Sequence, residues 1–90
     1  MADVFELFSD ADTRRVFEKI AEKKRTDFRE IGKELALSDD AEAAILDRLE
    51  NGGLVQRVRS PLSPVPVFDT FFLSVKGMET HRKMRAFARA

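Results

Sequence analysis

The sequence has no cysteine and only one histidine, and these absences remove several kinds of functional site. Without cysteine, the chain of 90 residues can form no disulfide framework, no thiolate metal site and no cysteine nucleophile. The single histidine, His81, has no aligned acidic partner on its predicted helix, and one histidine alone cannot hold a metal ion. We therefore predict no metal site and no cofactor.

Catalytic sequence patterns are also missing. The chain has no glycine-rich phosphate loop, no Ser-His-Asp spacing that His81 could serve, and no carboxylate pair in an apolar segment. We therefore predict that the protein is not an enzyme.

Long apolar runs are absent as well. No stretch approaches the roughly 20 apolar residues of a membrane-spanning helix. The acidic segment over residues 1–12 lacks an apolar run of signal-peptide length. The apolar content of 43% is enough for one modest core. We expect a single cytoplasmic domain over residues 1–90, with no membrane partner.

The net charge is zero, but the two signs are separated along the chain. Residues 1–50 carry fourteen acids and nine bases, a balance of −5, whereas residues 51–90 carry two acids and seven bases, a balance of +5. Such a separation indicates a polar partner, or self-association between opposite patches. A mixed, solvated surface explains it equally well.

Apolar residues at helical spacing predict two helices in the first third of the chain. The first is capped by Ser9 or Asp10 and runs to about Lys24. The second follows Thr26 and has Gly32 in its middle, where glycine costs about 1 kcal/mol relative to alanine. A glycine there allows another helix to approach closely. The expected core positions are Val16, Phe17, Ile20, Ala21, Phe28, Ile31 and Leu35.

A third helix is predicted between a cap at Ser38 and the stop signal at residues 51–53, Asn-Gly-Gly. Acidic residues in its first turns suit the positive end of the helix dipole. These residues are Asp39, Asp40 and Glu42. The predicted core side carries Ala41, Ile45, Leu46 and Leu49.

The remaining residues predict a hairpin and a last helix. Residues 54–59 are predicted to form one strand, and residues 67–73 form the return strand. Residues 60–66 form the loop between them, because their three prolines cannot take part in the hydrogen bonding of a β-sheet. Ser74 caps a helix from about Val75 to Arg89, and Gly77 near its start weakens it slightly. Its apolar side is expected at Val75, Met78, Met84 and Phe87.

Four segments together resemble a known family. LFSDADTRRVFEKI resembles the first helix of ArsR-type repressors, and TDFREIGKELALS resembles their turn-leading helix. AILDRLENGGLVQRVRS is similar to the recognition helix and first wing strand of ArsR- and MarR-type proteins, and FFLSVKG to the Leu-Ser/Thr-x-Lys-Gly signature that closes the wing. The resemblance covers roughly residues 5–85. It implies an α+β winged helix with a three-helix helix-turn-helix core, a two-stranded β-wing and a C-terminal helix.

The resemblance also implies a function. In winged-helix regulators of this type, the helix at 39–51 enters the major groove, the helix at 27–35 braces it, and the wing touches the backbone or minor groove. The expected role is transcriptional control, with duplex DNA as partner and a dimer as the active state. Metal-sensing ArsR proteins use cysteine, histidine or aspartate ligands, and this chain lacks such a set.

The third helix departs from a usual DNA reader in its charge. Carboxylates on the arc opposite the core repel phosphates, and base reading favours hydrogen-bond donors. Helix capping and the helix dipole explain Asp39 and Asp40, but they do not explain Asp47. A second hypothesis therefore stays open, a winged-helix protein-interaction module whose acidic helix meets a basic partner. The arc carries Asp39, Asp40, Ala43, Asp47 and, more laterally, Glu50.

Candidate contact residues follow from the resemblance and from strand alternation. Arg57 and Arg59 alternate along one strand and are expected on one face, where they reach phosphates or belong to an ordinary solvated surface. Arg48 lies on the flank of the third helix. The predicted DNA contacts are Arg14, Ala43, Arg48, Arg57 and Arg59.

The last helix is longer than one small core needs. In related folds such a helix pairs with its symmetry mate, so we expect a homodimer through it. His81 is expected to be a packing or interface histidine. The predicted dimer residues are Met78, His81, Met84 and Phe87.

Overall fold

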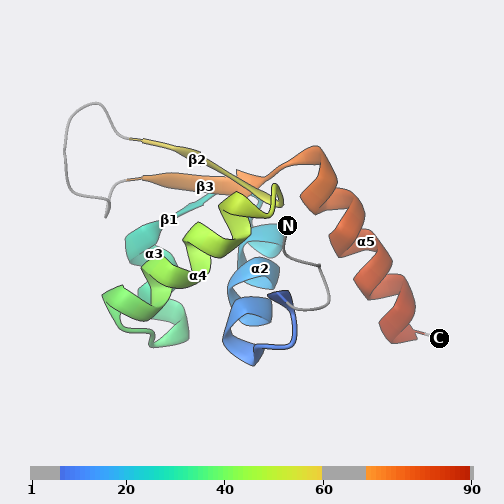
Figure 1. Ribbon diagram of the computed structural model, residues 1–90, viewed down its shortest axis with the longest axis horizontal. Helices are drawn as coiled ribbons and strands as arrows, with labels where there is room; N and C mark the ends of the chain where they lie inside the picture. Colours follow the sequence, from blue (N-terminus) through green and yellow to red (C-terminus); the bar gives the residue numbers. More distant parts are fainter. Residues whose placement is uncertain (1–6, 60–68, 90) are drawn as a thin grey trace.

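The predicted helices and hairpin strands follow one another in the expected order, with one short strand added between the first two helices (Figure 1). The computed structural model describes residues 7–59 and 69–89, and of the side chains in the last helix those up to Ala86. The elements are α2 (Ala11–Lys23), β1 (Thr26–Asp27), α3 (Phe28–Leu35), α4 (Asp39–Asn51), β2 (Val55–Val58), β3 (Thr70–Leu73) and α5 (Val75–Arg89). The α+β winged helix is thereby confirmed. The predicted loop at 60–66, the start of the return strand and the Phe87 side chain lie outside the described part.

Side-chain caps fix where the helices begin. Of the two cap candidates for α2, Asp10 is the cap, and its carboxylate accepts from the Thr13 backbone N–H at 3.1 Å. Asp27 caps α3, and Ser38 caps α4 as predicted, accepting from the Ala41 N–H at 3.2 Å. Each cap satisfies a backbone donor that the first turn leaves without a partner.

The sheet has three strands, one more than the sequence predicts. Its order is β1-β3-β2, and both neighbouring pairs are antiparallel. The added strand, β1, pairs Thr26 with Phe71 and Asp27 with Thr70. The Phe28 N–H donates to the Asp69 carbonyl oxygen at 3.3 Å and extends the pairing by one bond. The wing strands are therefore tied directly to the start of α3.

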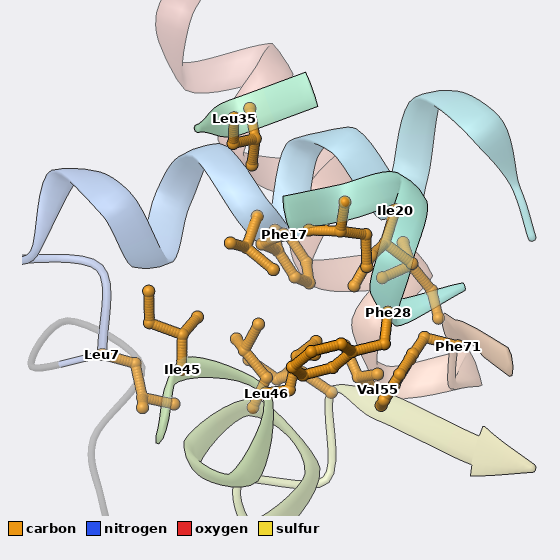
Figure 2. Packing of buried hydrophobic residues seen from close by; sticks show 14 residues of the cluster. Leu7, Phe17, Ile20, Phe28, Leu35, Ile45, Leu46, Val55 and Phe71 are labelled. Carbon is orange, nitrogen blue, oxygen red and sulfur yellow. The ribbon is translucent and has the colours of Figure 1, made fainter. Parts of the chain in front are cut away.

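The helices and the sheet share one apolar interior (Figure 2). Phe28 of α3, Leu46 of α4 and Phe71 of β3 converge on it and are almost completely buried. Burial of such side chains contributes about 1.5–3 kcal/mol each. Among the described residues the core consists of Leu7, Val16, Phe17, Ile20, Phe28, Ile31, Leu35, Ile45, Leu46, Leu49, Leu54, Val55, Phe71 and Leu73.

The prediction for the start of α4 is wrong at one position. Ala41 is exposed, and Glu42 is buried with 1% of its surface accessible. Glu42 precedes Ile45 and Leu49 by three and seven residues, so helical spacing places it on the buried side. It fits there because Gly32 of α3 has no Cβ, and a Cβ built on Gly32 would overlap the Glu42 carboxyl. The close approach expected at Gly32 is therefore made by this side chain.

The start of α5 also depends on a glycine. Gly77 is buried, and a Cβ at this position would overlap the Leu54 carbonyl group. Its N–H donates to Ser74 Oγ at 2.9 Å, which confirms the predicted cap. The predicted apolar side of α5 is split, because Val75 (70%) and Met78 (56%) are exposed whereas Met84 packs against the core. No helix within the described ranges is long and apolar enough to cross a membrane.

Candidate nucleic-acid interface

The outer face of α4 is open and acidic, as the sequence predicts. Asp40, Ala43 and Asp47 are exposed on it, and Glu50 is half-buried at its side. α4 lies beside the wing strands, and its inner face packs on α2 and α3 (Figure 1). A winged helix presents this surface to a major groove. The open geometry of this face of α4 suits that role, whereas its negative charges repel the phosphates of DNA.

Arg48 lies on the flank of α4, where it contacts the beginning of α2. Its guanidinium donates to Thr13 Oγ1 at 3.2 Å and lies 3.5 Å from Asp10 Oδ2. The Thr13 hydroxyl in turn donates to Asp10 at 2.6 Å. This hydroxyl, with smaller contributions from the Thr13 N–H and Arg48, lowers the pKa of Asp10 from its ordinary value of 3.8. The Arg48 side chain is half-exposed, and one of its guanidinium nitrogens is occupied by this contact.

Arg57 is bound to its own sheet instead of projecting from the wing. Its Nε donates to Asp69 Oδ2 at 2.8 Å, and a second guanidinium nitrogen lies 2.7 Å from the same oxygen. The group also lies 5.4 Å from the centre of the Phe71 ring. The side chains of Arg57 and Asp69 are 13% and 5% exposed. The sequence places Arg57 on a face with Arg59, but in the structure its donors are directed at Asp69.

Asp47 connects α4 to the wing strand β2. Its Oδ1 lies 3.6 Å from a guanidinium nitrogen of Arg57, and its side chain is 61% exposed. An exposed ion pair of this length stabilises a protein by less than about 1 kcal/mol. The contact nevertheless gives Asp47 a structural partner, which the sequence did not indicate. It also means that the acidic charge nearest the wing is partly compensated by Arg57.

Arg14 and Arg59 are the predicted contacts that remain accessible. Both are exposed, and within the described ranges neither forms an ion pair. Arg14 lies in the first turns of α2, close to the cap at Asp10. Arg59 directly follows the last residue of β2 in the sequence. Of the five predicted DNA contacts, these two arginines and Ala43 therefore have open surroundings.

A network of ion pairs holds α3 against α2. Lys23 Nζ lies 2.6 Å from Glu30 and 2.8 Å from Glu34, and Lys19 Nζ lies 3.7 Å from Glu34. The hydrogen bond from Lys23, with a second from the Thr26 hydroxyl, lowers the pKa of Glu30 from 4.5. Glu30 and Glu34 in turn raise the pKa of Lys23. The network fixes the helix that supports α4.

Of the predicted dimer residues, the three with described side chains, Met78, His81 and Met84, do not share one face of α5. Met78 points outward, whereas His81 packs against Phe17 of α2 with ring centres 5.9 Å apart and planes at 63°. Met84 is partly buried against the core. His81 therefore packs within its own chain, and its predicted place in a dimer interface stays a prediction. No group of three or more acidic or histidine side chains in the described part could hold a metal ion.

Comparison with known proteins supports the fold. No family model and no curated protein matches the chain by sequence. Among solved structures, the chain is similar to the PcaV transcriptional regulator from Streptomyces coelicolor, with a TM-score of 0.72, 23% identity, 88% of this chain covered and 57% of that one. It is also similar to FabT from Streptococcus pneumoniae in complex with DNA, with a TM-score of 0.70, 23% identity, 87% of this chain covered and 52% of that one. For a mutant MarR from E. coli complexed with operator DNA, the TM-score is 0.66 and the identity 25%, with 77% of this chain covered and 48% of that one.

These neighbours share the winged-helix fold of MarR-type transcriptional regulators, so the resemblance in the sequence is confirmed for the fold. The chain spans about half the length of the solved chains that it matches.

Proposed function

We propose that this chain is the DNA-binding part of a winged-helix transcriptional regulator that acts as a dimer. The main support is the open outer face of α4 beside the paired strands β2 and β3, the arrangement with which a winged helix meets a duplex. Two similar structures, FabT and a mutant MarR, are complexes with DNA.

The proposed contacts lie at the edges of the interface. Arg59 and Arg14 contact phosphates, and Arg48 joins them by leaving Asp10. Ala43, at the centre of the exposed face, can approach a groove closely, and its methyl group suits contact with the methyl group of thymine. Arg57 has a different part, because it holds the wing strands in place through Asp69.

The salt dependence of DNA binding tests this proposal. Three arginines per protomer give about six phosphate contacts per dimer, so the slope of log K against log salt should be about −5. The measurement is fluorescence polarisation with random-sequence duplex DNA between about 50 and 200 mM salt. Absence of binding at the lowest salt would contradict the proposal. A monomeric mass at high micromolar concentration would contradict its dimer.

Single substitutions locate the contacts. Arg59→Ala should make the slope shallower by roughly two for a dimer, because two phosphate contacts are lost. Lys24→Gln is the matched control, since Lys24 is an exposed cation in the groove between α2 and Arg85 of α5. An unchanged slope for Arg59→Ala, with wild-type stability, would remove the wing from the interface.

A second candidate function is a protein-interaction module in which the acidic face of α4 binds a basic partner. The engagement of Arg48 by Asp10 and of Arg57 by Asp69 favours it, because both predicted cations face carboxylates. The double variant Asp40→Asn with Asp47→Asn separates the two functions. A DNA-binding protein should bind DNA more tightly after losing these charges, whereas an interaction module should still not bind it.

A further inference from the structure

Glu42 is a carboxylic acid enclosed between the two helices of the helix-turn-helix. It belongs to α4, is 1% exposed and contacts the backbone of Gly32 in α3. Its Oε2 has no hydrogen-bond partner within the described part of the chain. An ionised carboxylate in such a place loses its hydration without full compensation, whereas the neutral acid loses much less.

The electrostatic surroundings act in the same direction as burial. Burial is the largest cause that raises the pKa of Glu42, from 4.5 to about 7. Asp39 on α4 itself and Asp27 at the start of α3 raise it further, and a hydrogen bond from the Gly32 backbone lowers it. Among the described residues, both charges that act on the carboxyl are negative, and α2 and β2 contribute none.

We propose that Glu42 carries a proton while α3 and α4 are packed together, and that loss of this proton loosens the interface between them. Ionisation places a negative charge between the two helices, close to Gly32 and to two other acids. Either the side chain must then move out, or α3 and α4 must separate enough to admit water. The helix-turn-helix therefore responds to pH near neutrality through a residue that does not lie on its exposed face.

The direction of the effect on stability follows from proton linkage. The pKa of Glu42 is higher in the folded protein than in the unfolded chain, so the folded state binds the proton more tightly. The stabilisation of the folded state by protonated Glu42 is complete below about pH 4.5 and is lost as the pH rises through about 7. Between pH 5.5 and 8 the unfolding equilibrium constant should increase by about 30-fold from this group alone.

Two measurements test the inference. In the wild-type protein, the carboxyl carbon of Glu42 should titrate in an NMR experiment with a midpoint near 7, well above its ordinary value of 4.5. The free energies of unfolding of wild type and of Glu42→Gln, measured with urea, should differ increasingly as the pH rises. The variant keeps the shape without the charge, so it should lack the roughly 30-fold dependence and exceed wild type in stability at pH 8.

Asp40→Asn is the control, because Asp40 is an exposed acid on the same helix and its loss should leave the wild-type pH dependence intact. A Glu42 carboxyl that titrates near 4.5 would overturn the inference even if Glu42→Gln failed to fold. Equal pH dependence in wild type and Glu42→Gln would also overturn it. None of these measurements uses DNA, so their outcome is independent of the proposed function.

Discussion

Replacing Arg57 by alanine tests whether this residue holds the wing together or is a free surface cation. The substitution removes both contacts to Asp69 Oδ2, at 2.8 and 2.7 Å, and the contact with the Phe71 ring. The Asp69 carboxylate, whose side chain is only 5% exposed, loses both contacts with Arg57. The neighbouring arginine in the sequence, Arg59, is exposed and makes no ion pair in the described ranges, so Arg59→Ala is the matched control.

The expected loss can be worked out from these contacts. Breaking a buried ion pair by removing one partner costs about 3–5 kcal/mol, and the partial exposure of Arg57 (13%) places this site at the lower end. The contact with Phe71 adds about 0.5 kcal/mol, and the longer contact with Asp47 adds less. In total we expect Arg57→Ala to lose about 3.5 kcal/mol of stability. A domain of this size has about 5–14 kcal/mol in total, so the variant should remain folded.

Urea unfolding at pH 7 measures this loss directly. With a slope of about 1–1.5 kcal/mol per molar urea, the midpoint of Arg57→Ala should fall by about 2–3.5 M, whereas Arg59→Ala should stay within about 0.5 kcal/mol of wild type. Arg57→Lys should fall between them, because lysine keeps the charge but not the planar fork. Equal midpoints for Arg57→Ala and Arg59→Ala would refute the reasoning and return Arg57 to the set of free surface cations.

Two further substitutions test the packing and capping of the helices. Gly77→Ala gains about 1 kcal/mol of helix propensity, but it places a Cβ against the Leu54 carbonyl group. Overpacking costs about 1–3 kcal/mol, and the contact here is with backbone, so we expect a net loss of stability in thermal unfolding. A more stable Gly77→Ala would contradict the close approach of α5. Ser38→Ala removes the cap of α4 and should lower stability by about 1 kcal/mol in the same assay, and an unchanged melting temperature would mean that water replaces the cap without cost.

The order of the elements could be predicted because its signals are local. Ser38, the Asn51 stop and Ser74 mark helix ends by chemistry that acts within one turn, and the structure places helix boundaries at these points. The last helix runs from Val75 to Arg89 as predicted. The open, acidic arc of α4 could be predicted as well, because helical spacing separates it from Ile45 and Leu49.

Glu42 could not be placed from the sequence, because two positions satisfied the helical spacing almost equally. Ala41 and Glu42 are adjacent, and hydrophobicity favours alanine as the buried one. The decision depends on the neighbouring helix, where the missing Cβ of Gly32 leaves space for the Glu42 carboxyl group. The glycine was a visible signal of close approach, but the sequence did not say which residue would approach it.

Arg57 and β1 show a second kind of limit. Strand alternation predicts on which side Arg57 lies, but it does not predict that Asp69, twelve residues later, holds its guanidinium. The two residues of β1, Thr26 and Asp27, are too few to show a period, and their partner strand is remote in sequence. Contacts between residues distant in the sequence therefore determine both the formation of β1 and the position of the Arg57 side chain.

The pairing of Thr26 with Phe71 has a consequence for how the chain folds. Phe71 follows Thr26 by 45 positions, so the sheet closes only when distant parts of the chain meet. Closing such a loop costs entropy before any contact repays it, and folding slows as contacts become more remote in sequence. We expect α2, α3 and α4 to form transiently on their own during synthesis. They become persistent only after β3 has left the ribosome and completed the sheet.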